Sequence, residues 1–203
     1  MKFPIVVKSL LTLPMMCLGV AAASHAAPTP PLRHMEGAPI RNFREVVPGR
    51  IYRSGQPTDH GFQWLKQHGF RSIVCLRREQ DDGATAMEQM GFHYLYLPIV
   101  DNQAPTTEQA ATFLKFASDP DNWPLVVHCH QGLGRAATMG ALIRYSFEGW
   151  PLANALAETH YSLFHGLVHR KLNGPQRRFL EAWTGSHLAG EMRPRQALGL
   201  DSR

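Results

Sequence analysis

The chain has 203 residues, 44% of them hydrophobic and 18% charged, and its formal net charge is +5. This is the composition of an ordinary globular protein with enough apolar residues for one core. Three cysteines are too few for a disulfide scaffold, and no run of Lys and Arg is dense enough to predict a nucleic-acid partner.

The first residues have the pattern of a secretory signal peptide. Lys2 and Lys8 precede an apolar run at 9–23, and small residues follow through Ala27. A cut after Ala26 satisfies the small-x-small rule, as does a cut after Ala23. We therefore expect a leader at 1–26, an exported protein that is periplasmic or secreted, and no stable membrane insertion after leader removal. The mature chain keeps 19 basic and 16 acidic side chains, a small excess that suits an anionic substrate or an ordinary soluble surface.

The remaining chain predicts one domain at 42–189, preceded by a flexible linker at 27–41 that is rich in Pro and small residues and followed by a loose tail at 190–203. Apolar periodicity and turn residues predict a strand pair within 42–57, a helix at 58–68, a strand at 70–76, a helix at 84–90, a strand at 92–100, a helix at 107–117, a strand at 125–128, and helices at 136–147, 151–164 and 175–187. Strands that alternate with helices predict an α/β domain with a central, mainly parallel sheet of four to five strands flanked by helices.

The run Val126-Val127-His128-Cys129-His130-Gln131-Gly132-Leu133-Gly134-Arg135 is an apolar strand that leads through a glycine-containing loop into a helix. A cysteine thiolate is a nucleophile, and positive potential from a helix N-terminus and a nearby arginine favours the thiolate form. The backbone N–H groups of residues 130–135 can converge on a phosphoryl group, and Arg135 adds a two-pronged guanidinium. The pattern predicts a phosphate-binding catalytic loop; the alternative is a buried cysteine at a strand end, with packing as its sole role.

This run resembles the His-Cys-x5-Arg signature of the protein tyrosine phosphatase superfamily, in its smaller, atypical dual-specificity branch. Residues 42–57, with Tyr52-Arg53-Ser54-Gly55-Gln56-Pro57, and residues 71–76 are similar to the opening of the plant, fungal and bacterial members of that branch. The resemblance implies a cysteine phosphatase fold and metal-independent hydrolysis of phosphomonoesters through a phosphocysteine intermediate. It also implies that no cofactor or metal is needed, and that the partner is a phosphorylated substrate, either a phosphoprotein or a small phosphomonoester. Nothing in the sequence indicates an oligomeric state.

Asp101 is the candidate for the acid that protonates the departing oxygen and then activates water. It follows the strand at 92–100, where a loop can bring its carboxyl group over the catalytic loop, and members of the superfamily carry their acid at a similar position. The alternative is an aspartate that forms a local turn.

One position departs from the family pattern. The superfamily usually has Ser or Thr directly after the loop arginine, where its hydroxyl stabilises the leaving sulfur, whereas this chain has Ala136 and Ala137. Thr138 lies too far around the helix to replace that hydroxyl with certainty. We therefore expect slow hydrolysis of the intermediate, and the alternative function is a phospho-ligand binding module with little turnover.

Members of the superfamily that act on highly phosphorylated inositols often have lysine inside the loop, whereas residues 130–134 contain none, so the resemblance favours a less charged substrate. An inositol phosphate or lipid phosphatase is a further alternative, since Arg77, Arg78, Arg177 and Arg178 can supply charge from outside the loop.

Cys75 stands near the end of the strand at 70–76, and strand ends of a parallel sheet gather at one edge. Because tensin-type lipid phosphatases have a similarly placed cysteine that pairs with the nucleophile, the resemblance implies Cys75 as a redox partner of Cys129. The alternative is a plain buried cysteine.

Four other residues have two interpretations each. His128 either supports the loop or is simply packed at the strand end, and His130 either adds positive charge to the site or faces solvent. Arg53 and Ser54 either contact the substrate or form an ordinary strand end.

Overall fold

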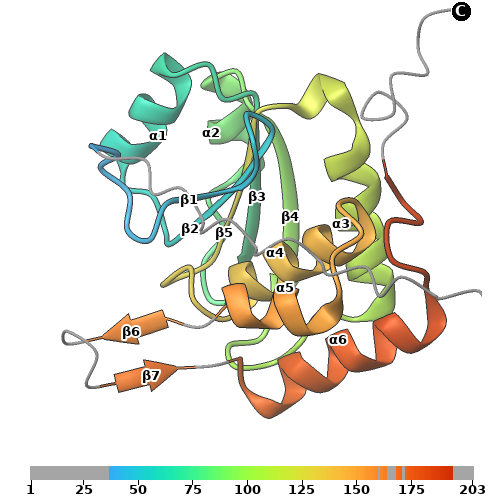
Figure 1. The fold of residues 1–203 in the computed structure, drawn as a ribbon. Coiled ribbons are helices and arrows are strands. Elements are labelled where there is room, and N and C mark those ends of the chain that lie inside the picture. The colour runs from blue at the N-terminus through green and yellow to red at the C-terminus, as the bar shows by residue number, and fades with distance from the viewer. Residues whose placement is uncertain (1–36, 160, 164–167, 171, 194–203) are drawn as a thin grey trace, which may run out of the picture.

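The computed structural model describes residues 37–159, 161–163, 168–170 and 172–193. The predicted leader at 1–26, the linker before residue 37 and the tail after residue 193 lie outside these ranges. The described elements are β1 (Arg44–Val47), β2 (Ile51–Ser54), α1 (Asp59–Gln67), β3 (Ser72–Arg77), α2 (Ala84–Gln89), β4 (His93–Ile99), α3 (Thr107–Ser118), the 3-10 helix η1 (Pro120–Asn122), β5 (Leu125–His128), α4 (Arg135–Ser146), α5 (Leu152–Glu158), β6 (Tyr161–Leu163), β7 (Val168–Arg170) and α6 (Gly174–Ser186) (Figure 1).

The central sheet has the strand order β1-β2-β5-β3-β4. β1 and β2 form an antiparallel pair, and every other neighbouring pair in this sheet is parallel. The predicted α/β fold with a mainly parallel sheet of four to five strands is therefore confirmed. β3 and β5 are buried along their whole length, as expected of inner strands of a sheet covered on both faces.

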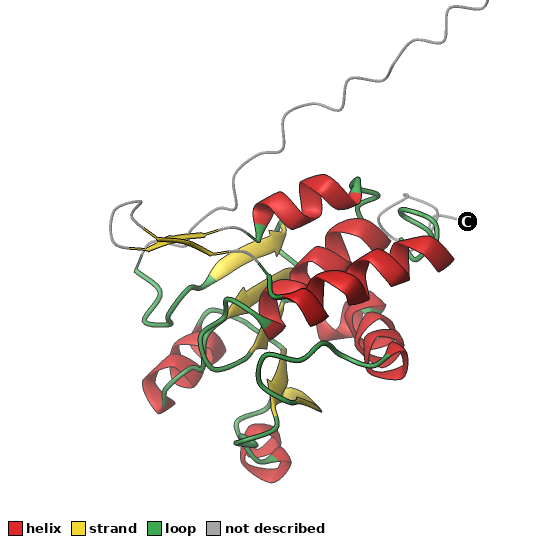
Figure 2. Cartoon of the chain, turned by 90° about the horizontal axis from the view of Figure 1, so that it is seen from below, coloured by secondary structure: helices red, strands yellow, loops and turns green. Residues whose placement is uncertain are grey.

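Two apolar cores lie on the two faces of the sheet. One contains Phe62 and Leu65 of α1 and Met87 of α2. The other contains residues of α3, α4, α5 and α6. In Figure 2 the strands lie between these groups of helices. Every residue of α4 is buried, which confirms the prediction of a nearly buried helix after the glycine-containing loop.

One predicted element is wrong in part. The helix expected at 151–164 ends at Glu158, and 161–163 pair with 168–170 as an antiparallel hairpin, β6–β7, that the sequence did not predict. The reason is that strand pairing satisfies the backbone through a partner several residues away, which helical periodicity does not reveal. Residue 164 lies outside the described ranges.

The packed chain reaches a few residues beyond the expected boundaries of the domain. Ile40 is buried. Gly190 and Met192 donate backbone hydrogen bonds to the last residues of α4, the carbonyls of Tyr145 and Ser146. No helix in the described residues is long and apolar enough to cross a membrane.

Candidate active site

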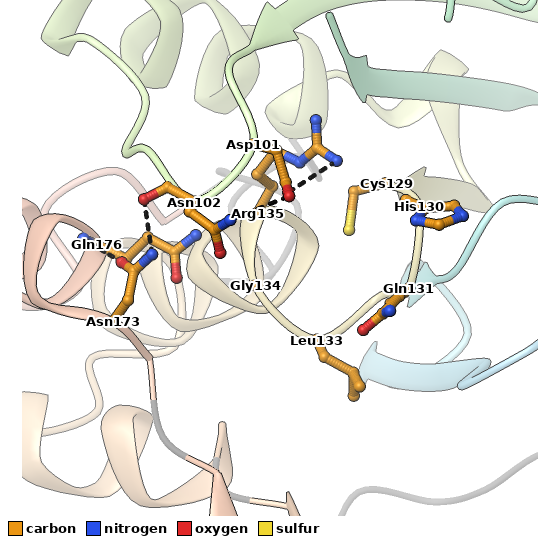
Figure 3. Close-up of a pocket in the computed structure, with 10 residues that line it drawn as sticks. All are labelled: Asp101, Asn102, Cys129, His130, Gln131, Leu133, Gly134, Arg135, Asn173 and Gln176. Carbon is orange, nitrogen blue, oxygen red and sulfur yellow. Dashed lines mark hydrogen bonds and ion pairs between the residues drawn. The ribbon is translucent and has the colours of Figure 1, made fainter. Parts of the chain in front are cut away.

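The predicted loop lies between the end of β5 and the start of α4, and it borders a cavity of about 260 Å³ (Figure 3). Cys129 is 3% exposed, and its sulfur accepts a hydrogen bond of 3.2 Å from the backbone N–H of Gly132. The structure brings most of the predicted site residues together around this cavity, which is lined by Asp101, Asn102, Cys129, His130, Gln131, Leu133, Gly134, Arg135, Asn173 and Gln176. Gly132 is the one predicted loop residue outside this lining.

Three consecutive carbonyl groups of the loop accept hydrogen bonds from the β1–β2 strand pair and the residues on either side of it. The carbonyl of His130 accepts from the N–H of Gln56 at 3.0 Å, and that of Gln131 from Nδ2 of Asn42 at 2.7 Å. The carbonyl of Gly132 accepts from Nη1 of Arg53 at 2.6 Å. A trans peptide points its N–H away from its C=O, so the N–H groups of residues 131–133 face away from the β1–β2 strand pair. The N–H of Gly132, which donates to the sulfur, fits this arrangement.

Gly132 lies directly on the backbone that follows β2. Its φ is +78°, and a Cβ atom at this position would lie 2.6 Å from the N atom of Gly55. Only glycine accommodates both the positive φ and this close approach. Arg53 and Ser54 therefore support the loop from behind: Arg53 donates to the Gly132 carbonyl, and the carbonyl of Ser54 accepts from the N–H of Cys129 at 3.3 Å.

Arg135, at the start of α4, is 2% exposed, and its guanidinium is held by four groups, one of which is the carbonyl of Leu76 at 3.5 Å. It donates to both carboxylate oxygens of Glu79 at 2.8 Å and to the carbonyl of Ile99 at 2.9 Å. Its Nη2 also lies 3.2 Å from Oδ1 of Asp101. The hydrogen bonds from Arg135 hold the pKa of Glu79 well below its usual range, and although burial alone would lower the pKa of Arg135, Glu79 raises it. Both terminal nitrogens of Arg135 are thus occupied, one of them by the predicted acid.

Asp101 follows β4, and its side chain is 69% exposed at the rim of the cavity. The next residues of this loop are held by α6. Nδ2 of Asn173 donates to the carbonyl of Asn102 at 2.6 Å, and Nε2 of Gln176 donates to that of Gln103 at 3.3 Å. The carboxyl group of Asp101 is therefore both exposed to solvent and in contact with Arg135.

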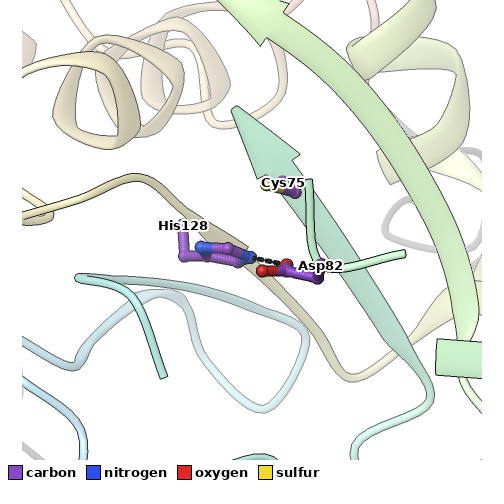
Figure 4. A group of neighbouring side chains, drawn as sticks. All are labelled: Cys75, Asp82 and His128. Carbon is purple, nitrogen blue, oxygen red and sulfur yellow. Dashed lines mark hydrogen bonds and ion pairs between the residues drawn. The ribbon is translucent and has the colours of Figure 1, made fainter. Parts of the chain in front are cut away.

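His128 is fully buried, and its Nε2 lies 2.7 Å from Oδ2 of Asp82 (Figure 4). Burial alone would raise the pKa of Asp82, but the interactions with His128, Gln56 and Cys75 together outweigh burial, so the pKa is lowered. Nδ1 of His128 is a buried side-chain atom with no hydrogen-bond partner among the described residues. His128 therefore supports the nucleophile loop through Asp82.

Cys75 lies beside this pair. The donor atoms of Cys75, Asp82 and His128 lie within 4.8 Å of one another, and burial raises the pKa of the Cys75 thiol to about 12. Cys75 is level with His128 in the β3–β5 ladder, and His128 contacts Phe62 of the core beneath α1 and α2. Cys129 packs in the core on the opposite face of the sheet. Both thiols are free, so the Cys75–Cys129 disulfide stays a prediction that requires one thiol to change faces.

The position directly after Arg135 carries no hydroxyl, as the sequence indicated. Ala136 is fully buried, and Oγ1 of Thr138 donates to the carbonyl of Gly134 at 3.1 Å. Among the described residues, no hydroxyl donates to the sulfur of Cys129.

Sequence reasoning missed Glu79, Asp82, Asn173 and Gln176. Glu79 and Asp82 belong to a polar run directly after a buried strand, and polar residues at the carboxyl ends of parallel strands are the signal that could have found them. Asn173 and Gln176 carry no such signal, because they reach the cavity through the packing of α6.

Comparisons with known proteins agree with this geometry. A family model described as DSP-PTPase phosphatase fused to NAD+ kinase matches residues 40–170. Probable tyrosine-protein phosphatase DG1060 of Dictyostelium discoideum is 28% identical over 141 residues, covering 66% of this chain and 82% of the relative. Inositol diphosphatase DSP3 of Arabidopsis thaliana is 30% identical over 127 residues, covering 60% of this chain and 62% of the relative.

NAD kinase 2 of Arabidopsis thaliana is 33% identical over 96 residues, which cover 44% of this chain and 10% of the relative's length. Among solved structures, Tk-PTP in its active form superposes with a TM-score of 0.60 and 25% sequence identity, over 71% of this chain and 97% of Tk-PTP. Because the family model matches more than half of the residues, the chain belongs to the DSP-PTPase phosphatase family.

Proposed function

We propose that the chain is a metal-independent phosphomonoester hydrolase that acts through a phosphocysteine intermediate. The observation that carries the proposal is the shared cavity of Cys129, Arg135 and Asp101, in which the nucleophilic sulfur already accepts the N–H of Gly132. A sulfur at the floor of an amide-lined loop, an arginine and an exposed carboxyl group are the parts that thiolate phosphoryl transfer needs.

The chemistry proceeds in two steps. The Cys129 thiolate attacks phosphorus, the bond between phosphorus and the ester oxygen breaks, and Asp101 gives its proton to that oxygen. Water then attacks the phosphocysteine, Asp101 accepts a proton from the water, and the phosphorus–sulfur bond breaks with its electron pair on sulfur. The products are inorganic phosphate and the thiolate. Arg135 and the loop amides bind the phosphoryl oxygens in both steps.

A second cavity beside the first supports a proposal about the class of substrate. It has a volume of about 620 Å³, shares Asp101 and His130 with the first cavity, and is also lined by Arg77, Arg78, Glu79 and Val100. Val100 is 43% exposed directly beside the proposed acid, so an apolar leaving group can pack on it. These features favour an aryl phosphate such as phosphotyrosine. An inositol phosphate is the second candidate, because Arg78 is exposed at the same cavity and can bind further phosphates.

Hydrolysis of 4-nitrophenyl phosphate by the chain without residues 1–26, and by Cys129→Ser, tests the proposal. Chelator and reductant are present throughout, and both proteins are checked for folding by circular dichroism. We expect activity that is lost in the variant. A folded chain that binds phosphate in competition assays but hydrolyses nothing would establish the binding-module alternative. A parallel screen of phosphotyrosine peptides and inositol phosphates ranks the two substrate classes.

We also propose that the protein is exported and acts in the periplasm or outside the cell. The support is the sequence alone: two lysines, the apolar run at 9–23 and the small residues after it. N-terminal sequencing of the protein recovered from intact cells should begin at residue 27, or at residue 24 if the alternative cut is used. A protein that retains Met1 would contradict export.

A further inference from the structure

Arg53 is a buried arginine in β2 that lies beneath the catalytic loop. It is 5% exposed, and its Nη1 donates to the carbonyl of Gly132 at 2.6 Å. The side chain passes against α4 at Gly140, where a Cβ atom would lie 3.2 Å from Cδ of Arg53. The guanidinium is therefore held between the loop and the helix after it.

The positive charge of Arg53 has no carboxylate partner at ion-pair distance among the described residues. The charged groups that act on it are Arg44 of β1, Arg144 of α4, Glu158 of α5 and Cys129. Arg144 and Glu158 form an ion pair with each other at 2.7 Å, so Glu158 is already neutralised. A buried charge without a partner is costly, which makes a negative charge on Cys129 favourable for Arg53.

The pKa of Arg53 is consistent with a charged side chain at neutral pH. Burial and, to a smaller extent, the neighbouring Arg44 lower it to about 10, whereas Glu158 and a Cys129 thiolate act in the opposite direction. Because interaction between two charges is reciprocal, a guanidinium that gains from the thiolate also stabilises the thiolate.

The loop lacks the usual source of that stabilisation. Position 136 is an alanine, and the hydroxyl of Thr138 is occupied by the carbonyl of Gly134. The one hydrogen bond to the sulfur among the described residues comes from the N–H of Gly132.

We propose that Arg53 is a positioning residue that stabilises the Cys129 sulfur as a thiolate, in place of a hydroxyl at position 136. The proposal rests on the phosphocysteine chemistry proposed above. When water attacks the phosphocysteine, the electron pair of the phosphorus–sulfur bond moves to sulfur and the proton of the water moves to Asp101. The positive charge beneath the loop lowers the energy of that developing thiolate.

Arg53 also orients the loop. Its hydrogen bond turns the Gly132 carbonyl away from the cavity, and the planar trans peptide directs the N–H of Leu133 to the opposite side. The same hydrogen bond polarises this peptide group and strengthens its N–H as a donor. Arg53 thus acts on the phosphoryl site without contacting substrate.

The test compares Arg53→Gln, which removes the charge, with Arg53→Lys, which keeps it. Arg71→Gln is the matched control, because Arg71 is exposed and precedes Ser72 of β3, which pairs with Leu125 at the end of β5 away from the loop. The readout is the rate of Cys129 alkylation by iodoacetamide at pH 6, followed by peptide mass spectrometry, on proteins with unchanged circular dichroism. This rate reports the thiolate fraction and requires no hydrolysis.

We expect alkylation to be about tenfold slower in Arg53→Gln, less affected in Arg53→Lys and unchanged in Arg71→Gln. A folded Arg53→Gln protein that is alkylated at the normal rate would overturn the proposal. A wild-type chain without hydrolytic activity would instead refute the proposed function and leave the alkylation result intact.

A second experiment does not require Arg53→Gln to fold. Ala136→Ser is introduced into the wild type and into Arg53→Met, which removes the charge and leaves an apolar side chain, and the steady rate after any initial burst is measured. If Arg53 replaces the hydroxyl, the serine should restore about threefold or more to Arg53→Met and add less than about twofold to the wild type. Equal gains in the two backgrounds would show that residue 53 and the hydroxyl act independently. This result would contradict the proposal that Arg53 replaces the hydroxyl.

Discussion

The carboxylate of Glu79 accepts one hydrogen bond of 2.8 Å on each oxygen from the guanidinium of Arg135. Three residues later, Asp82 binds His128, the residue before the nucleophile. The loop between β3 and α2 thus holds both the residue before Cys129 and the arginine at the end of the signature. The signature is therefore oriented by side chains that lie far from it in the sequence.

Glu79→Gln should weaken the orientation of the Arg135 guanidinium. The variant loses the charge and one of the two acceptor oxygens, so Arg135 is less well oriented for the phosphoryl group. We expect kcat/KM for an aryl phosphate to fall about tenfold, equivalent to ~1.4 kcal/mol. Glu181→Gln is the control, because Glu181 forms an exposed pair with Arg177 on α6. Equal kinetics for the two variants would contradict the orienting role of Glu79.

The loss of rate caused by Asp101→Asn should depend on the leaving group of the substrate. An alkyl phosphate needs a proton on its departing oxygen, whereas 4-nitrophenolate leaves more readily without one. We expect the rate of the first step, phosphoryl transfer to Cys129 measured in the initial burst, to fall about a hundredfold or more with an alkyl phosphate and much less with 4-nitrophenyl phosphate. Asp59→Asn, at an exposed position of α1, should leave both rates unchanged. An equal loss on the two substrates would mean that Asp101 serves binding rather than proton transfer.

Asp82→Asn should change the pH dependence of stability. Burial raises the pKa of Asp82, but its interactions with His128, Gln56 and Cys75 together lower it by more, so the folded protein releases this proton more readily than the unfolded chain. The resulting stabilisation is fully present above the ordinary pKa of aspartate and is lost as the pH falls through the lower folded pKa. We expect the variant to be about 2 kcal/mol less stable at neutral pH.

Urea unfolding of both proteins from neutral pH to roughly pH 3 measures this difference. The gap between the wild type and Asp82→Asn should narrow as the solution is acidified. A gap that stays constant or widens would show that the carboxylate does not stabilise the fold through its charge.

Cys75 should be much less reactive than Cys129. Burial raises the pKa of the Cys75 thiol to about 12, so at pH 8 roughly one molecule in ten thousand carries the thiolate. Iodoacetamide labelling of the folded protein should modify Cys129 first, and unfolding in urea should equalise the two. After mild peroxide, a Cys75–Cys129 disulfide would show that the thiols meet in a rearranged state, whereas sulfinic acid at Cys129 alone would exclude pairing.

Gly132→Ala should disrupt the conformation of the catalytic loop. The methyl group would lie 2.6 Å from the backbone of Gly55 and would need a positive φ. We expect activity to fall about a hundredfold or more, since a loop shift of this size misplaces the amides. Gly185→Ala is the matched control, because nothing lies within 4 Å of its Cβ position and alanine favours a helix. Full activity in Gly132→Ala would show that the loop does not need its present conformation.

The sequence by itself determined the alternation of strands and helices, the position of the loop at 129–134 and the two residues that begin and end the signature. These features are local: apolar periodicity, glycines and the spacing of Cys129 and Arg135 are written within short windows. The hairpin β6–β7 escaped prediction because its two strands stabilise each other across an intervening segment.

The tertiary structure alone decided which residues support the loop. Arg53 and Asn42 reach its carbonyls because β2 pairs with β5 in the sheet, although they are separated by 79 and 89 residues from their acceptors. Glu79 reaches Arg135 because β3 also borders β5. Strand order is set by long-range packing, so a sequence window that shows the nucleophile does not show the groups that orient it.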